Sequence, residues 1–395
     1  MKKLSIIYLS ISLILVLFLC GCGNNSNKIN YANKYVFGQD SQENCIETQG
    51  VANLAESKDC YYYVNSENSF LYVIDKKTRK CMPLCNKTNC LHDKETSPKK
   101  CNAYISSSSG QVIYYDDNLY YTSERESTDK DGVVHFVTDI VCSSLDGSTK
   151  KTIYSTEKYD IYNFKIHRGY IYANLILIGK NGAESYDASL YKISLKENSK
   201  ETEFLPFKKY YDKSKVSISD MRFYGNNLIL EFNKFLGNDD GYNILVNYDL
   251  KTDKWINLNK KIKDNVDSFI TVCNGNIYYS IDNKVYCCDL NGNNIKCIFD
   301  NSKKAIKQVA GLKYFDPYSN DGKNVIISVS DDKDVSKNVI FYDTDTGKTE
   351  IKHIPSEMGV RVGGDENSLI YMYNKTLYYF DKEKDKSYSI YKFDN

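Results

Sequence analysis

Histidine, tryptophan, proline and methionine are scarce in this chain of 395 residues, which contains 4 His, 1 Trp, 5 Pro and 5 Met. Four histidines leave few imidazoles for proton transfer in catalysis. The chain also lacks the G-x-S-x-G, H-E-x-x-H, G-x-x-x-x-G-K-[ST] and G-x-G-x-x-G patterns. These absences exclude the common signatures of serine hydrolases, zinc proteases and nucleotide-binding enzymes, and the sequence assigns no catalytic residue.

Neither sign of charge dominates the chain. It contains 52 Lys and Arg against 51 Asp and Glu, and the two kinds alternate along its length. Domains that bind nucleic acid concentrate Lys and Arg in a patch or stripe, and no such basic block is present. The sequence therefore does not predict a nucleic-acid partner.

The long apolar run of the chain lies at its N-terminus. Lys2 and Lys3 precede a nearly unbroken apolar segment at 4–19, which leads into Leu-Cys-Gly-Cys at 19–22. This run of about 16 residues is shorter than the roughly 20 that span a bilayer as a helix. Residues 1–21 are therefore predicted to be an export signal rather than a transmembrane anchor.

The Leu-x-Gly-Cys sequence resembles the lipobox of bacterial lipoproteins. The resemblance implies that Cys22 carries the lipid and becomes the first residue of the mature protein. Cys20 is the other candidate, but it follows the larger Leu19. Acyl chains add roughly 0.8 kcal/mol per buried CH₂, so several of them on one residue hold a protein firmly. The expected location is the extracytoplasmic face of the cell membrane, with residues 22–34 as an Asn-rich, flexible tether.

Beyond the tether, pairs of tyrosine-rich segments with alternating hydrophobicity recur seven times. Equivalent positions are 44 to 58 residues apart, and each pair has a third strand candidate after it and a weaker one before it. A repeat of this length with four short strands is typical of a propeller blade. The predicted fold is all-β, with residues 35–395 forming one β-propeller of seven four-stranded blades; six or eight blades are the alternatives. The pairs are CYYYV/FLYVIDKKT, NLYYTS/DIVCSSLDG, YIYANL/SLYKISLKE, NLILEF/ILVNYDLKTD, NIYYSI/KVYCCDLNG, NVIISVS/VIFYDTDTG and SLIYMYN/TLYYFDKEKD.

Tyrosine suits such strands because its ring packs on a pleated surface while its hydroxyl reaches water or backbone. The 36 tyrosines are therefore predicted to pack between blades, with a carbohydrate-binding aromatic rim as the alternative. Residues 35–37 are a candidate strand for closing the ring against the last blade. His135 and His167 are predicted to lie at the surface, and His353 in a strand.

Eleven cysteines follow Cys22, and an odd number leaves at least one thiol without a partner inside the chain. Cys273, Cys287, Cys288 and Cys297 belong to the fifth repeat, on its first, third and fourth strands. Adjacent residues on a strand face opposite sides, so Cys287 and Cys288 cannot share a partner. Buried free thiols and a bridge to Cys297 are both compatible with this pattern.

The stretch 81–101, CMPLCNKTNCLHDKETSPKKC, gathers four cysteines and one histidine. It follows the first repeat and precedes NAYISSS, a candidate for the first strand of the second repeat. The stretch is therefore predicted to be a loop between two blades. Loops on a rigid scaffold carry function more often than strands do, which makes this loop a candidate site.

Three interpretations of the loop remain open. In the first, Cys85, Cys90, His92 and Cys101 form a structural zinc site, since three thiolates and one imidazole suit tetrahedral Zn²⁺. The C-x4-C-x-H spacing is not that of a standard zinc finger. In the second, two disulfides form among Cys81, Cys85, Cys90 and Cys101, in one of three connectivities. In the third, one of these cysteines is a nucleophile with His92 as its base.

Several motifs carry a resemblance to a known family. They are Pro83-Leu84-Cys85, Asn89-Cys90-x-His92-Asp93 and Cys101-Asn102-Ala103-Tyr104, together with the lipobox and the LYY and LY-x-x-D repeats. With these, the chain resembles uncharacterised lipoproteins of low-GC Gram-positive anaerobes that carry a β-propeller domain likened to that of low-density-lipoprotein-receptor-related proteins. The resemblance covers nearly the whole chain and implies a propeller at the cell surface rather than a particular activity. The spacer ETSPKK is expected to alter the shape of the loop in this chain.

The sequence thus predicts a membrane-anchored, extracytoplasmic β-propeller that binds a protein or carbohydrate ligand. It predicts no cofactor apart from a structural zinc. The alternative is an extracellular glycan hydrolase or lyase that uses two carboxylates at the mouth of the propeller channel.

Overall fold

The chain divides into two compact units, Met1–Ala32 and Asn33–Asn395, and the described residues all belong to the second. The predictions for the export signal, Cys22, the tether and the strand at 35–37 lie outside the described residues. The computed structural model describes residues 47–48, 51–65, 67–92, 100–106, 110–128, 130, 132–178, 184–185, 189–204, 216–235, 241–262, 266, 270–301, 314–319, 324–330, 336–358, 360–365 and 367–393.

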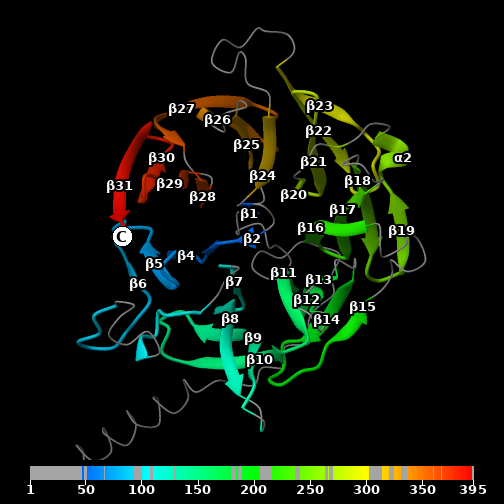
Figure 1. Cartoon of the computed structure of the whole chain (residues 1–395). Coiled ribbons are helices and arrows are strands. Elements are labelled where there is room, and N and C mark those ends of the chain that lie inside the picture. Colours follow the sequence, from blue (N-terminus) through cyan, green and yellow to red (C-terminus); the bar gives the residue numbers. More distant parts are fainter. Residues whose placement is uncertain are drawn as a thin grey trace, which may run out of the picture. The chain divides into compact units, whose positions relative to one another are not determined.

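Seven antiparallel sheets, each with four main strands in chain order, stand side by side around a ring (Figure 1). The first strand of each sheet lies toward the centre of the ring and the fourth toward its rim. The chain is therefore a seven-bladed β-propeller, as the repeat predicted. The first four blades consist of β3 (Leu54–Glu56), β4 (Cys60–Asn65), β5 (Phe70–Asp75) and β6 (Cys81–Pro83); β7 (Val112–Tyr115), β8 (Asn118–Thr128), β9 (Val134–Ser144) and β10 (Lys150–Thr156); β11 (Tyr159–His167), β12 (Tyr170–Ile178), β14 (Leu190–Ser194) and β15 (Thr202–Phe204); and β16 (Val216–Tyr224), β17 (Asn227–Phe235), β18 (Gly241–Asp249) and β19 (Lys254–Asn257).

The other three blades repeat this order, and a few short elements accompany the ring. A two-residue strand, β13 (Glu184–Ser185), adds to the third blade; a short helix, α2 (Asn259–Ile262), follows the fourth; and β1 (Glu47–Thr48) pairs with β2 (Val51–Ala52). No helix among the described residues is both long and apolar enough to span a bilayer. The remaining blades consist of β20 (Thr271–Cys273), β21 (Asn276–Ile281), β22 (Lys284–Asp289) and β23 (Lys296–Asp300); β24 (Tyr314–Ser319), β25 (Asn324–Ser330), β26 (Ser336–Asp343) and β27 (Thr349–Met358); and β28 (Val360–Asp365), β29 (Ser368–Tyr373), β30 (Thr376–Asp381) and β31 (Lys386–Lys392).

Burial follows the position of a strand within its blade. Five of the six residues in β4 and in β21 are buried, because a second strand is covered on both faces by neighbouring blades. None of the seven residues of the outer strand β31 is buried. Tyrosine and β-branched residues therefore fill the middle strands, where a pleated surface packs on both sides.

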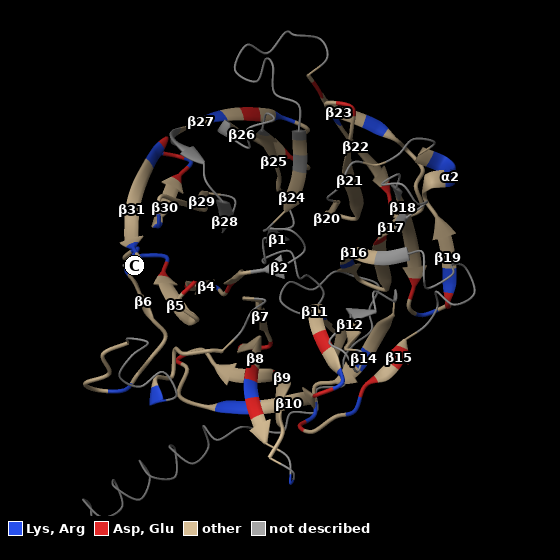
Figure 2. Ribbon diagram, viewed as in Figure 1, with Lys and Arg blue, Asp and Glu red and all other residues tan. Residues whose placement is uncertain are grey.

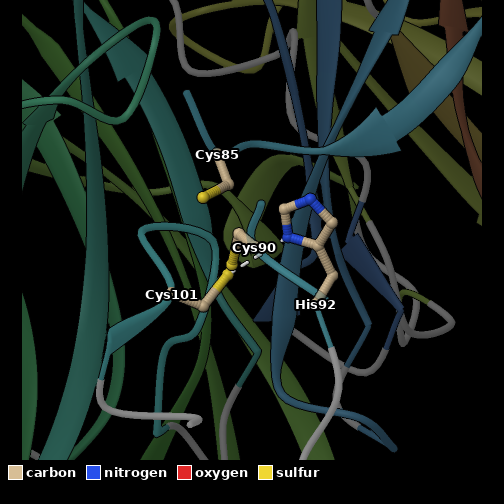
Figure 3. Close-up of side chains that lie close together, drawn as sticks. All are labelled: Cys85, Cys90, His92 and Cys101. Carbon is tan, nitrogen blue, oxygen red and sulfur yellow. Dashed lines mark hydrogen bonds between the residues drawn. The ribbon is translucent and has the colours of Figure 1, made fainter. Parts of the chain in front are cut away.

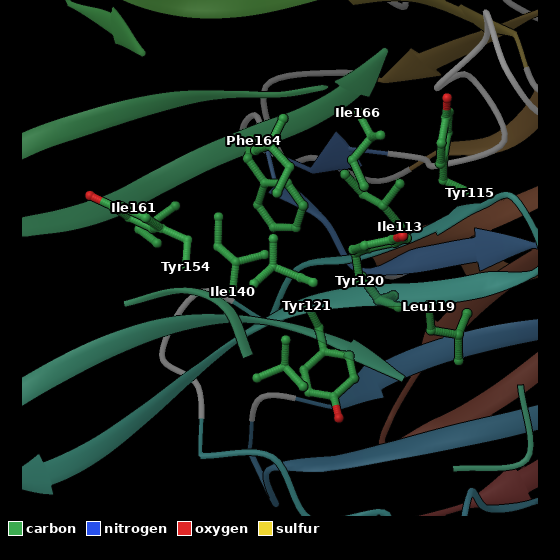
Figure 4. Close-up of a cluster of buried hydrophobic side chains, with 14 of the residues drawn as sticks. Ile113, Tyr115, Leu119, Tyr120, Tyr121, Ile140, Tyr154, Ile161, Phe164 and Ile166 are labelled. Atoms are coloured by element: carbon green, nitrogen blue, oxygen red, sulfur yellow. The ribbon is translucent and has the colours of Figure 1, made fainter. Parts of the chain in front are cut away.

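The apolar core lies between blades rather than in one central body. Figure 4 shows part of this core, in which Ile113 of β7 and Tyr120 of β8 lie toward Phe164 and Ile166 of β11, while the ring of Tyr121 points the other way. Tyr121 and Phe164 are almost completely buried. Rings from the tyrosine-rich strands thus form core contacts between blades, as the sequence predicted.

Turns between the third and fourth strands reach the preceding blade. Gly147, in the β9–β10 turn, has φ +70°, and a Cβ there would lie 2.7 Å from the carbonyl oxygen of Leu84. Only glycine tolerates both this backbone conformation and this approach. The Asp146-Gly147 pair therefore marks a turn, as expected from sequence, and it also holds the chain just after β6.

The ring closes through side chains between the last blade and the first. Every blade consists of consecutive strands, so no described strand crosses from one end of the chain to the other. Arg79, in the β5–β6 turn, forms an ion pair of 2.9 Å with Asp381 and lies over the rings of Tyr379 and Tyr388. The ring of Phe393 packs against Tyr72, with 5.1 Å between centroids.

Two boundary predictions near the cysteine-rich stretch were wrong. Cys81–Pro83 is the strand β6, so the connection to the second blade begins at Leu84 rather than at Cys81. The first strand of the second blade is β7, not NAYISSS, although Tyr104 makes an isolated bridge back to Phe70. A three-residue strand is too short to show any periodicity in the sequence.

Candidate metal centre

The connection from Leu84 to Ser106 brings three thiols and one imidazole together. The ligand atoms of Cys85, Cys90, His92 and Cys101 all lie within 4.8 Å of one another, and Figure 3 shows their side chains converging. Nδ1 of His92 is 3.4 Å from Sγ of Cys101. These four residues, named here the Cys₃His cluster, are the set that the sequence proposed for zinc.

Local backbone geometry turns these side chains toward one point. Asn89 and His92 adopt φ of 62° and 57°, a left-handed conformation in which Asn and His are enriched among non-glycine residues. The turn at Asn89 precedes Cys90, and the turn at His92 follows it by two residues. Two such turns within four residues allow Cys90 and His92 to face the same centre.

Hydrogen bonds join the two arms of the connection, 84–92 and 100–106, to the first blade and to each other. The Leu84 N–H donates to Leu71 O at 2.8 Å, and the Ile105 N–H donates to Ser69 O at 2.9 Å. Across the arms, Asn102 Nδ2 donates to Asn86 Oδ1 at 2.8 Å. The ends of both arms are therefore fixed on the blade.

The distances in the Cys₃His cluster are close to those of a tetrahedral zinc site. With Zn–S bonds of about 2.3 Å, two thiolate sulfurs lie about 3.8 Å apart across the tetrahedron. Ligand atoms at up to 4.8 Å need side-chain shifts of about 1 Å to reach that geometry. Such shifts lie within the range of χ adjustments, so the residues present fit a metal ion such as zinc.

The electrostatics differ between two of the thiols. Burial alone would raise the pKa of the Cys85 thiol. This effect is outweighed by hydrogen bonds to its sulfur, from the backbone N–H groups of Lys87 and Asn102 and from the thiols of Cys90 and Cys101. The pKa of Cys85 therefore lies below the usual value for a cysteine. Burial is the main reason why the pKa of Cys101 is raised. Cys85 is therefore the thiol of this pair that ionises first.

A lysine of the second blade completes the surroundings. Lys150 Nζ donates to Tyr104 O at 3.3 Å, and burial lowers its pKa while Cys101 and Cys85 act to raise it. Lys87 Nζ donates to Lys100 O at 2.5 Å, between the two arms. The contact of Lys150 had no signal in the sequence, because this residue lies 46 positions after Tyr104 in an ordinary strand.

The Cys₃His cluster borders the core that closes the ring. Cys101 is 6% exposed and belongs to the buried cluster that includes Tyr72 of the first blade and Phe393 at the end of the last. Cys85 and Cys90 pack against that same cluster. The candidate metal centre and the junction of the first and last blades are therefore parts of one continuous packing unit.

The other described cysteines lie on strands, and none of them is in a disulfide within the described part of the chain. Cys81 lies outside the Cys₃His cluster, on β6, and burial raises its pKa to about 12. In the fifth blade, Cys273, Cys287–Cys288 and Cys297 lie on β20, β22 and β23, as expected from sequence. Cys273 and Cys288 are buried, which fits the interpretation as buried free thiols.

The prediction that His167 lies at the surface was wrong. His167 is 1% exposed, its ring stacks on Phe223 with 4.6 Å between centroids, and its Nε2 lies 2.8 Å from Gly225 O. It ends β11, where the fourth blade covers the strand. The sequence shows the turn that follows His167 but not the neighbouring blade, which explains the error.

A buried carboxylate also lies on an inner strand. Asp220 of β16 forms an ion pair of 3.0 Å with Arg222 and accepts the Met221 N–H at 2.7 Å. Both side chains of this pair are less than 10% exposed. The ion pair with Arg222 explains structurally why a carboxylate is buried at Asp220. The alternative of a glycan-active enzyme stays a prediction. Basic and acidic residues are interspersed over the described ring (Figure 2).

Comparisons with known proteins found similar solved structures, but no family model and no curated protein matches the chain. Among solved structures, it is similar to the β-propeller domain of the Trilobed protease from Pyrococcus furiosus, at 10% identity and a TM-score of 0.47, over 91% of this chain and 98% of that one. It is also similar to an oligogalacturonate lyase in complex with manganese (9%, TM-score 0.42, 69% and 85%) and to apo AztD from Citrobacter koseri (10%, TM-score 0.41, 84% and 81%).

Proposed function

We propose that the chain is a ligand- or protein-binding β-propeller, anchored through lipidated Cys22 at the extracytoplasmic face of the membrane. We further propose that one structural zinc ion, bound by the Cys₃His cluster, fastens its first inter-blade connection. The observation that carries the zinc proposal is the convergence of four ligand atoms within 4.8 Å. Anchoring and location rest on the lipobox.

The donor set supports a structural rather than a catalytic ion. Three cysteines and one histidine fill all four positions of a tetrahedral site and leave none for water or substrate. When bound, zinc would cross-link Cys85, Cys90 and His92 on one arm to Cys101 on the other. A polar connection of this length has no core of its own, so such a cross-link replaces missing hydrophobic contacts.

The two competing interpretations of the loop fit the described geometry less well. Two disulfides need all four cysteines, and Cys81 is not among the converging groups. A cysteine nucleophile needs one activated thiol beside a base, whereas here three thiols surround the imidazole. One disulfide within the cluster would still leave one of its thiols unpaired.

Metal analysis of protein purified without oxygen tests the zinc proposal. We expect one equivalent of zinc, which Cys90→Ser removes and Cys297→Ser retains; Cys297 is an exposed cysteine on β23 and serves as the matched control. Thiol counting on the denatured, zinc-free protein completes the measurement. Protein without metal and without reactive thiols at Cys85, Cys90 and Cys101 would refute the zinc site and establish disulfides.

Membrane fractionation tests the anchor separately. We expect Cys22→Ala to release the protein from membranes, while Cys20→Ala leaves it bound. Retention of the Cys22→Ala protein would contradict lipidation at this residue. The outcome is independent of the zinc measurement, because Cys22 is not one of the proposed zinc ligands.

A further inference from the structure

A cavity of about 480 Å³ lies where the fourth blade meets the β22–β23 turn of the fifth. Small-molecule sites commonly measure about 300–1,000 Å³. This cavity is remote in the sequence from the Cys₃His cluster and uses none of its residues. Its lining residues are Asn227, Asn247, Asp249, Thr252, Asp253, Lys254, Trp255, Ile256 and Asn291.

The only tryptophan of the chain, Trp255, belongs to this lining. Its indole is half-buried and packs against the ring of Tyr248, with 5.2 Å between centroids and 57° between planes. The Tyr248 hydroxyl also donates a hydrogen bond to Asp253 Oδ1. One buried tyrosine therefore fixes both the aromatic surface and a carboxylate of the cavity.

The polar groups of the lining are also held in place by the protein. Asp249 Oδ1 accepts the N–H groups of Lys251 and Thr252 at 2.8 and 2.9 Å, and its Oδ2 has no partner in the described part of the chain. Asn247 Nδ2 donates to Asn227 Oδ1 and to Leu290 O, at 3.0 and 2.6 Å. Groups that are already oriented lose little freedom when a ligand binds.

An unsatisfied amide oxygen belongs to one of the residues that line the cavity. Asn247 is only 2% exposed, yet its Oδ1 has no hydrogen-bond partner among the residues that the structure describes. Buried polar atoms are almost always paired in native proteins, so such an exception calls for an explanation. The oxygen itself is buried, so a ligand hydroxyl in the cavity would reach it only after a shift of the Asn247 side chain.

We propose that this cavity is a binding subsite for a neutral saccharide. A pyranose presents hydroxyls around its edge and C–H groups on its faces. Planar amides and carboxylates bind neighbouring hydroxyls, and an indole ring packs against the C–H face. The lining matches both requirements, with three asparagines, two aspartates and one indole and with Ile256 as its only aliphatic side chain.

The charges of the lining decide against other ligands. Two carboxylates against Lys254 give a net negative site, which repels phosphates and uronates. Carboxylate oxygens instead accept strong hydrogen bonds from uncharged hydroxyls. The same two carboxylates could also bind a divalent cation, which is the competing ligand. The experiment therefore includes calcium.

This inference specifies the ligand class of the proposed binding role and does not depend on the zinc. A protein that binds zinc and membranes as proposed but no saccharide would overturn the saccharide subsite alone. Conversely, saccharide binding by protein without zinc would leave this inference intact. The two proposals are therefore tested by separate outcomes on the same preparation.

Because the chain contains one tryptophan and it lines the cavity, the fluorescence of the full-length protein reports on this site. Trp255 emission is followed during titration with maltohexaose, cellohexaose and N-acetylchitohexaose, with hexagalacturonate and with CaCl₂. We expect a saturable change with at least one neutral probe and none with hexagalacturonate or calcium. Absence of a saturable change and of calorimetric heat with every neutral probe overturns the proposal, and so does a response to calcium alone.

Two variants at one turn position locate the binding. The N–H of Asn291 donates to Asp289 Oδ1 and that of Asp345 donates to Asp343 Oδ1, both at 2.9 Å, so the two residues are equivalent in adjacent blades. Only Asn291 lines the cavity. We expect Asn291→Ala to weaken saccharide binding about tenfold, which corresponds to about 1.4 kcal/mol, and Asp345→Ala to change it less than twofold. Equal effects of the two variants would place the ligand elsewhere and overturn the assignment.

Discussion

At the scale of single residues, Gly147 shows how closely two blades approach each other. The turn that contains it rests on the backbone of Leu84, one residue before the first ligand of the Cys₃His cluster. Glycine is needed at position 147 for two separate reasons. The backbone has a positive φ, and a Cβ would collide with Leu84 O. Gly132 shares only the first, with φ +81° and nothing within 4 Å of an added Cβ.

The pair Gly147→Ala and Gly132→Ala separates these two reasons. Both variants place alanine in the left-handed region, which costs about 1–2 kcal/mol. Only Gly147→Ala also forces its Cβ against Leu84 O, and overpacking adds about 1–3 kcal/mol. We expect urea unfolding to show the larger loss for Gly147→Ala; equal midpoints for the two variants would mean that the turn moves away freely.

Lys150 is a positive charge near the proposed metal centre. Three thiolates, one neutral imidazole and Zn²⁺ carry a net charge of −1, which a nearby ammonium stabilises. We expect Lys150→Gln to keep zinc but to release it to a chelator about 2–5 times faster, as for a partly exposed ion pair of 0.3–1 kcal/mol. Lys158→Gln in the connection from β10 to β11, whose ammonium contacts Tyr159, is the control. Unchanged release would show that Lys150 does not stabilise the site.

At the scale of elements, an aspartate lies at the start of the turn between the third and fourth strands or within that turn in several blades. Asp75, Asp146 and Asp343 accept hydrogen bonds from residues two or three positions later. These bonds favour the charged carboxylate and lower its pKa: from Thr78 to Asp75, from Ser144 and Ser148 to Asp146, and from Thr346 to Asp343.

These lowered pKa values predict how stability depends on pH. The folded carboxyls have lower pKa values than the unfolded ones, so their contribution is complete above the usual pKa of about 3.9 and is lost as the pH falls below it. We expect the triple variant Asp75→Asn, Asp146→Asn, Asp343→Asn to lose less stability than the natural chain between pH 5 and 3. Urea midpoints across this range measure the difference.

A matched triple variant controls for the change of net charge. Glu157, Glu197 and Glu383 are exposed, and their replacement by glutamine removes the same number of charges. If this variant flattened the pH dependence as much as the aspartate variant, the turns would not be the cause.

Strand pairs were the part of the fold that the sequence predicted best. Pairs such as NIYYSI with KVYCCDLNG combine a period of two with a turn signal, and both properties are local. The Cys₃His cluster was also predictable, since its four residues lie within 17 positions of one another in the sequence. Burial of His167 and the contact of Lys150 depend on a neighbouring blade, and no local pattern encodes which surface covers a strand.

At the scale of the whole molecule, the junction of the first and last blades stands out. It relies on side chains, among them Arg79 between Tyr379 and Tyr388 and the hydrogen bond of 3.0 Å between Tyr61 and Ser368. The Cys₃His cluster packs against the same junction. A metal bound there would stabilise the contact between residues more than 250 positions apart.

Arg79→Ala is expected to loosen this junction. The variant removes two cation–π contacts and one ion pair with a buried carboxylate, at a cost of about 1–3 kcal/mol. Hydrogen exchange should accelerate first in β6 and in β28–β31. Arg125→Ala, which removes an ion pair with Asp139 inside the second blade, is the control. Exchange that rises equally in all blades would contradict a local role for Arg79.

Construction from consecutive strands also has a consequence for biosynthesis. As the chain emerges from the ribosome, each blade is complete as soon as its fourth strand is made, and it can pack at once on the blade before it. The last blade has to find the first across the largest separation in the chain, which is the slowest kind of contact to form. Until then the nascent protein is an open arc with two apolar ends, and the closing of that arc is the step at which a chaperone or a metal ion would change its yield.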